Sequence, residues 1–65
     1  MNGKTIGERL VALRGTKSQA EVAEACGISV SAVGMYERDE RVPRDEIKKK
    51  LANYFKVSVG SLFFD

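Results

Sequence analysis

The sequence contains no histidine and only one cysteine among its 65 residues. A single cysteine cannot form an internal disulfide, so a disulfide framework is excluded. Without histidine, the chain also lacks the ligands of a cysteine/histidine zinc site and the commonest general acid–base residue. The sequence has no glycine-rich phosphate-binding loop either, and we therefore expect no metal, no cofactor and no enzymatic activity.

Long apolar runs are missing as well. No stretch approaches the roughly 18–20 apolar residues that a membrane-spanning helix needs. Lys4, Glu8 and Arg9 place charges where a signal peptide would have its apolar segment. We expect a cytoplasmic protein with no membrane association.

Glycine occurs six times and proline once, which is too few for a flexible low-complexity chain, and the hydrophobic fraction of 43% is that of a globular protein. A chain of this length buries only about 60% of the surface that it exposes when unfolded, so a deep cleft between lobes is not expected. Residues 1–65 should form one domain. The net charge of +2 only hints at an anionic partner.

Apolar spacing and capping residues predict short helices and no stable strand. The first helix is expected over residues 5–14, capped by Thr5 or Asn2 and ended by Gly15. Its apolar stripe comprises Ile6, Leu10 and Leu13.

Ser18 and Glu21 have capping-box spacing for a second helix, which Gly27 ends. Ser29 should cap a third helix that runs to about Arg38. The inner faces of these two helices comprise Val22, Ala23, Cys26, Val33 and Tyr36, with Ala32 at the edge.

After a charged loop over Asp39–Val42, Pro43 fits the first turn of a fourth helix. Its apolar face comprises Ile47, Leu51, Tyr54 and Phe55. Ser58 should cap a final turn that carries Val59, Leu62 and Phe63. The predicted fold class is all-α, a compact five-helix bundle.

The stretch from Gln19 to Arg38 has the spacing of two short helices that cross steeply through a tight turn. Such a crossing needs a small residue where the backbones approach, and Ala23 opposite Val33 supplies it. The chain reversal needs positive φ, which Gly27 tolerates. Ile28 should help to close the wedge between the helices.

These positions resemble the Cro/C1-type (XRE) helix-turn-helix family of DNA-binding regulators, with a lambda-repressor-like fold and the helix-turn-helix at about residues 18–38. The resemblance extends from about Ile6 to Phe64. It is carried by residues 18–23, 27–33, 36–38 with Pro43, and 57–59 with Leu62 and Phe63. Two features depart from the family pattern: residues 15–17 form a short connection, and Asp39 stands where glycine is common.

The resemblance implies that the helix beginning at Ser29 enters the major groove of double-stranded DNA. Its outward positions, expected to meet the bases, are Val30, Ser31, Gly34 and Met35. Ser31 can donate or accept at a base edge, and Val30 can contact a thymine methyl. Because this face has few hydrogen-bonding groups, we expect bridging water and DNA shape to share the recognition.

Phosphate contacts should supply most of the affinity. The expected contacts are Gln19 and Ser29 at helix starts, and Arg38, Arg41 and Arg44 after the third helix. Arg44 can alternatively enter an adjacent minor groove. Glu37 matches a family position whose carboxylate pairs with an arginine of the first helix, and Arg14 is the candidate partner.

Several residues have a structural interpretation beside a functional one. Cys26 is interpreted as a small core residue rather than a reactive thiol. Lys48, Lys49 and Lys50 are interpreted as a solvated face in preference to a second DNA contact. Phe64 is either a core residue or a dimer contact.

The predicted function is a sequence-specific transcriptional regulator of the repressor kind, which binds a pseudo-palindromic operator as a homodimer. The alternative is an antitoxin or protein-interaction module, in which a toxin or anti-repressor is the partner and DNA binding is secondary. The apolar and small residues Val30, Gly34 and Met35 keep this alternative open.

Overall fold

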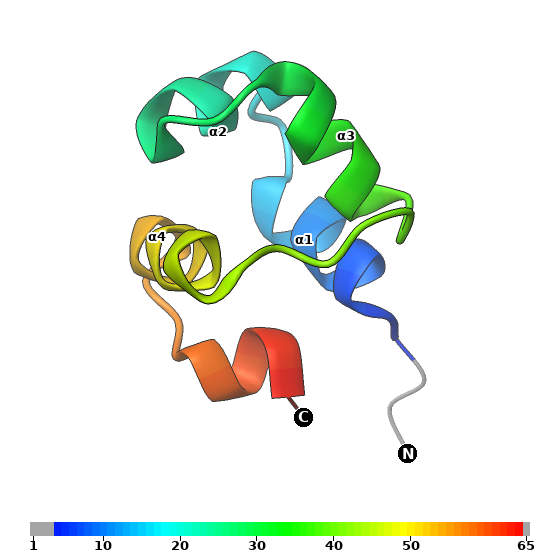
Figure 1. Cartoon of the computed structure of the whole chain (residues 1–65), viewed down its shortest axis with the longest axis vertical. Coiled ribbons are helices and arrows are strands. Elements are labelled where there is room, and N and C mark those ends of the chain that lie inside the picture. Colours follow the sequence, from blue (N-terminus) through cyan, green and yellow to red (C-terminus); the bar gives the residue numbers. More distant parts are fainter. Residues whose placement is uncertain (1–3, 65) are drawn as a thin grey trace.

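The computed structural model describes residues 4–64, and these fold into four α-helices and a short π-helical segment. The elements are α1 (Ile6–Arg14), α2 (Gln19–Cys26), α3 (Val30–Glu37), α4 (Asp45–Phe55) and η1 (Gly60–Phe64). Figure 1 shows α2 and α3 together at one end of the long axis and η1 at the other, with α1 and α4 between them. The predicted all-α, five-helix architecture is confirmed, and no strand occurs among residues 4–64.

Side-chain caps explain where the first three helices begin. Thr5 Oγ1 accepts from the Glu8 N–H at 3.1 Å, while Glu8 Oε1 accepts from the Thr5 N–H at 2.9 Å, which completes a capping box. Ser18 Oγ accepts from the Glu21 N–H, and Ser29 Oγ accepts from the Ala32 N–H, each at 3.0 Å. Thr5 is therefore the cap of α1, whereas the other candidate, Asn2, lies outside the described residues.

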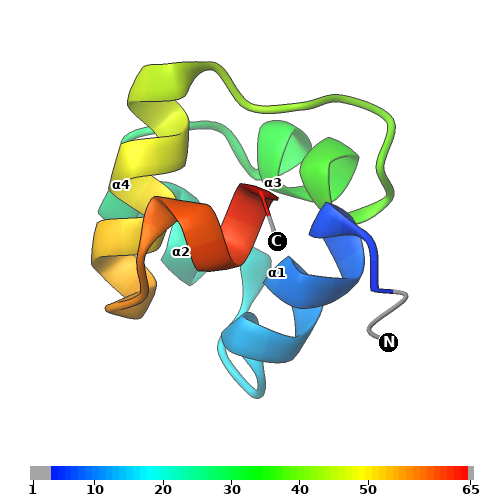
Figure 2. The ribbon, with the colours of Figure 1, turned by 90° about the horizontal axis from the view of Figure 1, so that it is seen from below.

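The start of α4 differs from the prediction. Pro43 was expected in the first turn, but it precedes the N-cap residue Arg44, and the helix begins at Asp45. Arg44 makes no side-chain capping bond. Pro43 is buried, so its ring packs against the bundle where the connecting segment turns into α4. Figure 2 shows that segment running along one side of the molecule from α3 to α4.

The core lies where α1, α2, α3, α4 and η1 converge. Its buried apolar residues are Leu10, Val22, Ala23, Cys26, Val33, Tyr36, Leu51, Ala52, Leu62 and Phe63. Ile47, Tyr54 and Phe55 pack against this cluster while half-buried. The predicted apolar stripe of α1 is only partly confirmed: Leu10 is buried and Ile6 packs against the core, but Leu13 is 37% exposed. Leu13 instead borders a surface hollow next to Val57.

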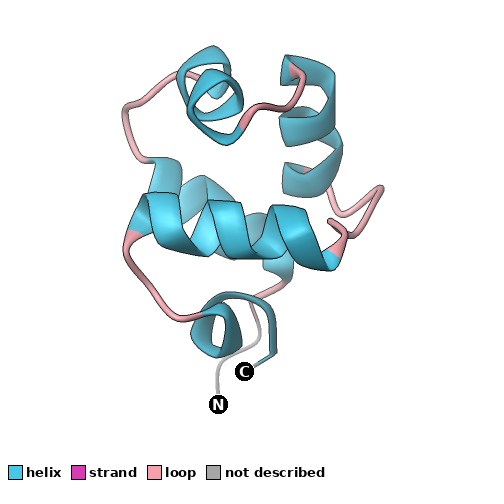
Figure 3. Ribbon diagram, turned by 60° about the vertical axis from the view of Figure 1, so that its left-hand side comes forward, coloured by secondary structure: helices cyan, strands magenta, loops and turns pink. Residues whose placement is uncertain are grey.

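The last element, η1, is held by a local cap at Ser58 and by hydrogen bonds to α1. Ser58 Oγ accepts from the Ser61 N–H at 3.0 Å, as the predicted cap of a final turn requires. Arg9 Nη1 donates to the carbonyls of Ser61 and Leu62, which joins η1 to α1. Figure 3 shows the helices and the short loops that connect them. No helix within residues 4–64 has the length and apolar character needed to cross a membrane.

Candidate nucleic-acid interface

The α2–α3 unit has the tight turn that the sequence predicts. Gly27 adopts φ 67° and ψ 35°, the left-handed conformation, and ends α2. The N–H of Ile28 then donates to the Ala23 carbonyl at 3.0 Å, and Ser29 starts the next helix. Ala23 and Val33 are both buried in the core cluster, as the predicted wedge requires. Only three residues separate the two helices, and this holds α3 in a fixed orientation against α2.

The outward face of α3 is exposed at its N-terminal end. Val30 is 46% exposed, and Ser31 is also exposed. Met35 is half-buried, and Gly34 is buried. The accessible outward surface of this helix therefore narrows toward its C-terminal end.

Arg38, the residue after α3, folds back along the helix rather than away from it. A Cβ built on Gly34 would lie 3.0 Å from Nη1 of Arg38 and 3.7 Å from its Cζ. The guanidinium thus lies over Gly34. Glu40 holds it there, because Nε and Nη2 donate to the two carboxylate oxygens of Glu40, each at 3.1 Å. These bonds raise the pKa of Arg38 and lower the pKa of Glu40.

Glu37 joins three helices through one carboxylate. Arg14 Nε donates to Oε2 at 2.6 Å and Arg14 Nη2 to Oε1 at 3.2 Å, which confirms the expected pair. The same hydrogen bonding raises the pKa of Arg14. Gln19 Nε2 also donates to Oε1 of Glu37, at 2.8 Å. The half-buried Gln19, predicted to contact phosphate, is therefore oriented at the start of α2 by an internal bond.

Asp39 connects the residues after α3 to the start of α1, a contact that its position in the sequence does not predict. It adopts φ 60°, the conformation that favours glycine, and its carboxylate reaches back to the start of α1. Oδ2 accepts from the Thr5 hydroxyl at 2.6 Å, and Oδ1 accepts from the Gly7 N–H at 2.9 Å. These bonds lower the pKa of Asp39. A Cβ on Gly7 would overlap the Glu37 carbonyl oxygen, so this close approach of α1 to α3 requires glycine.

The remaining predicted contacts surround the α2–α3 unit. The Ser29 hydroxyl accepts the capping bond and keeps its own hydrogen for donation. Arg41 and Arg44 are exposed on the segment that connects α3 to α4. They border a surface hollow together with Ile28 and Tyr36. Gln19, Ser29, Arg41 and Arg44 as phosphate contacts stay predictions.

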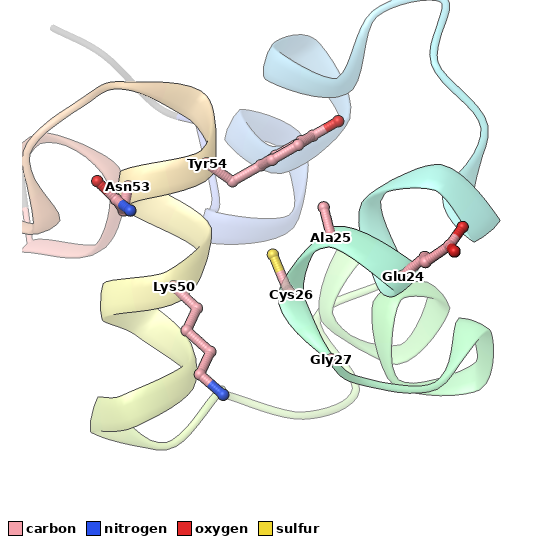
Figure 4. A pocket seen from close by; sticks show the side chains of 7 residues that line it. All are labelled: Glu24, Ala25, Cys26, Gly27, Lys50, Asn53 and Tyr54. Atoms are coloured by element: carbon pink, nitrogen blue, oxygen red, sulfur yellow. The ribbon is translucent and has the colours of Figure 1, made fainter.

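Cys26 borders a separate hollow between α2 and α4, which Figure 4 shows with Lys50 and Tyr54 on its opposite side. The thiol is buried, and burial raises its pKa, which disfavours the reactive thiolate. Residues 4–64 contain no group of three or more histidine, cysteine or acidic residues arranged to hold a metal ion. The interpretation of Cys26 as a core residue is confirmed by its burial.

Two hydrogen-bonded pairs, Arg38 with Glu40 and Gly7 with Asp39, are not among the contacts predicted from the sequence. Glu40 lies two residues from Arg38, and Asp39 lies 32 residues from Gly7 along the chain. The two acidic residues between Arg38 and Arg41 are a sequence signal for the first pair. The Asp39 contact depends on how α1 packs against α3, and no local pattern in the sequence reports it.

Comparison with protein families agrees with this geometry. A family model described as helix-turn-helix matches residues 9–62, which spans α2, the turn and α3 together with most of the bundle. The chain belongs to the Cro/C1-type (XRE) helix-turn-helix family. It is a DNA-binding regulator of that type, and double-stranded DNA is the partner that the family implies. Neither the curated proteins nor the solved structures include a significant match to the chain.

Proposed function

We propose that this protein represses transcription by binding a pseudo-palindromic operator as a homodimer, with α3 in the major groove. The observation that carries the proposal is the exposed N-terminal end of α3, with Val30 and Ser31 accessible and with Arg41 and Arg44 exposed beside the helix-turn-helix. The major groove is wide enough to admit one such helix. Ser31 contacts a base edge, Val30 contacts a thymine methyl, and DNA shape adds to the selectivity.

Phosphate contacts give most of the affinity in this proposal. Gln19 is suited to this role because its Nε2 group carries two hydrogens, of which one bonds Glu37 and the other is left to donate. Ser29 keeps its hydroxyl hydrogen at the start of α3. Arg41 and Arg44 contact the flanking backbone, and Arg44 can alternatively enter the adjacent minor groove.

A dimer is proposed because one short helix contacts too few base pairs to find a single site in a genome. Two helix-turn-helix units related by a two-fold axis read half-sites about 34 Å apart, which is one turn of DNA. The surface of α4 and η1 that includes Phe64 is the proposed interface, since Phe64 is 69% exposed.

Selection of bound duplexes from a random pool tests the proposal. We expect a two-fold symmetric motif whose half-sites lie about one helical turn apart. Binding to the selected duplex should then weaken steeply with salt, by a log–log slope of about 0.9 for each phosphate contacted. An asymmetric motif would contradict the dimer, and the absence of any enriched motif would contradict sequence-specific binding.

A matched pair of charge reversals separates local contact from net charge. Arg41→Glu should weaken duplex binding strongly and reduce the salt slope, because it removes a phosphate contact and repels the backbone. Lys50→Glu makes the same change in charge at an exposed position of α4, outside the α2–α3 unit, and should have a small effect. Equal losses in both variants would contradict a specific interface at Arg41.

The exposed Val30 also suits a protein partner, so an antitoxin or interaction module is the second candidate function. The salt titration distinguishes the two functions. A flat response to salt, together with weak duplex binding, would favour a protein partner at the α3 face.

A further inference from the structure

Near the C-terminal end of α3, the guanidinium of Arg38 lies over Gly34, which has no side chain of its own. Val30, Gly34 and Arg38 are spaced four residues apart and therefore follow one side of the helix. Gly34 has no side chain, and Nη1 of Arg38 lies 3.0 Å from the place where its Cβ would be. The Arg38 side chain thus lies one turn back, next to the residues expected to face the bases.

Glu40 holds this guanidinium by one edge. The carboxylate accepts from Nε and from Nη2, each at 3.1 Å, so it binds the edge that these two nitrogens form. A guanidinium has five N–H donors in a rigid fork. The second edge, formed by Nη1 and the other hydrogen of Nη2, keeps its donors and can bind a pair of acceptors.

The charge of this pair favours a neutral acceptor over a phosphate. Arg38 and Glu40 together carry no net charge, and the Glu40 carboxylate is 55% exposed beside the guanidinium. A phosphate at the second edge would be repelled by that carboxylate. Guanine is neutral and presents two acceptors, O6 and N7, in the major groove at the spacing of the guanidinium fork.

No other side chain on the outward face of α3 can make a bidentate contact to a base edge. Val30 and Met35 have no strong hydrogen-bonding group, Gly34 has no side chain, and Ser31 carries a single hydroxyl. A bidentate contact to a base edge therefore requires a longer side chain, and Arg38 has one in position.

We infer that Arg38 is a specificity-determining residue that reads a guanine in each half-site through Nη1 and Nη2, with Glu40 as its positioning residue. The absence of a side chain at Gly34 makes room for the guanidinium. This inference rests on the proposed function, because it requires α3 to enter the major groove, and it replaces the expected phosphate contact of Arg38.

Three variants and the selected duplex test the inference. Arg38→Lys keeps the positive charge but loses the fork, and Arg38→Ala loses both. We expect each to reduce the preference for guanine at one position per half-site by about 5- to 150-fold, which corresponds to the roughly 1–3 kcal/mol of a bidentate base contact. Glu40→Gln should also reduce that preference, although it removes a negative charge close to DNA and should strengthen binding to unrelated duplexes.

Arg41→Lys is the matched control. A phosphate contact depends mainly on charge, so this variant should keep both the base preferences and the salt slope of the wild type. Melting curves should show that all four variants are folded, since Arg38, Glu40 and Arg41 are exposed.

The outcomes separate this inference from the proposed function. Uniform weakening across all duplexes by Arg38→Ala, with rescue by Arg38→Lys and a salt slope reduced by about one unit, would identify a phosphate contact and overturn the inference alone. A wild-type protein that selects no duplex would overturn the proposed function itself. Loss of guanine preference in Arg38→Lys with an unchanged salt slope supports the inference.

Discussion

Arg14 and Glu37 form a two-bond ion pair that joins the last turn of α1 to the last residue of α3, with a shortest nitrogen–oxygen distance of 2.6 Å. The Glu37 side chain is only 7% exposed, so water does not satisfy its carboxylate. Gln19 adds a third bond from α2. The pair therefore fixes the orientation of α3 relative to α1.

Replacing Arg14 by alanine should destabilise the fold. It leaves the nearly buried Glu37 carboxylate with Gln19 as its remaining partner, and we expect a loss of about 2 kcal/mol in the free energy of unfolding, as for hydrogen bonds to charged groups. Urea denaturation measures this loss. Arg38→Ala is the control. Both side chains of the Arg38–Glu40 pair are exposed, so losing this pair should barely change the urea midpoint of unfolding. Equal midpoints for the two variants would contradict a structural role for Arg14.

Asp39 should make stability depend on acidic pH. Its bonds to Thr5 and Gly7 hold the folded-state pKa below the ordinary value of 3.8, so the folded state favours the ionised carboxylate. The stabilisation is fully present well above pH 3.8 and is lost as the pH falls through the lower folded-state pKa. Unfolding of Asp39→Asn, followed between pH 3 and pH 6, should therefore show a smaller loss of stability on acidification than wild type. Parallel curves for the two proteins would refute this role of Asp39.

The positions of the helices follow from local chemistry, and for that reason they were predictable from the sequence. Ser18 and Ser29 accept bonds from N–H groups three residues ahead, and Gly27 takes a left-handed conformation, whatever the rest of the chain does. Family resemblance then identified Glu37 as the partner of Arg14, because that pair belongs to a conventional helix-turn-helix arrangement.

Contacts between distant segments were not predictable in the same way. Leu13 follows the apolar spacing of α1, yet it is 37% exposed because the core ends before it. The hydrogen bonds of Asp39 to the start of α1 depend on two helices meeting at Gly7, and the sequence shows only an acidic residue where glycine is common. The position of Arg38 over Gly34 depends on a side-chain rotamer, which residue spacing does not determine.

Two helices end in the same left-handed backbone conformation, one at a glycine and the other at a lysine, and substitutions at the two positions should have opposite effects on stability. Gly27 ends α2 at φ 67°, and Lys56 ends α4 at φ 60°, both left-handed. A residue with a Cβ costs about 1 kcal/mol in this conformation relative to glycine. Gly27→Ala should therefore lower the melting temperature and Lys56→Gly should raise it. Calorimetry of both variants checks the two signs, and a stabilising Gly27→Ala would be incompatible with the turn.

Phe64 gives the sharpest test of the proposed dimer. Phe64 is 69% exposed, and the ammonium of Lys48 lies 4.7 Å from its ring centre, next to a hollow that Val59 and Lys49 also border. An exposed aromatic ring next to a hollow is suited to bury against a second copy of the chain. Phe64→Ser should therefore raise the dimer dissociation constant in sedimentation equilibrium by about tenfold or more, since burying a phenylalanine is worth about 1.5–3 kcal/mol. Val42→Ser is the matched control, because Val42 is 62% exposed on the segment between α3 and α4 and should leave the dimer fraction unchanged. If Phe64→Ser associates as the wild type does, the interface lies elsewhere on the molecule, whereas a loss confined to Phe64→Ser supports pairing through α4 and η1.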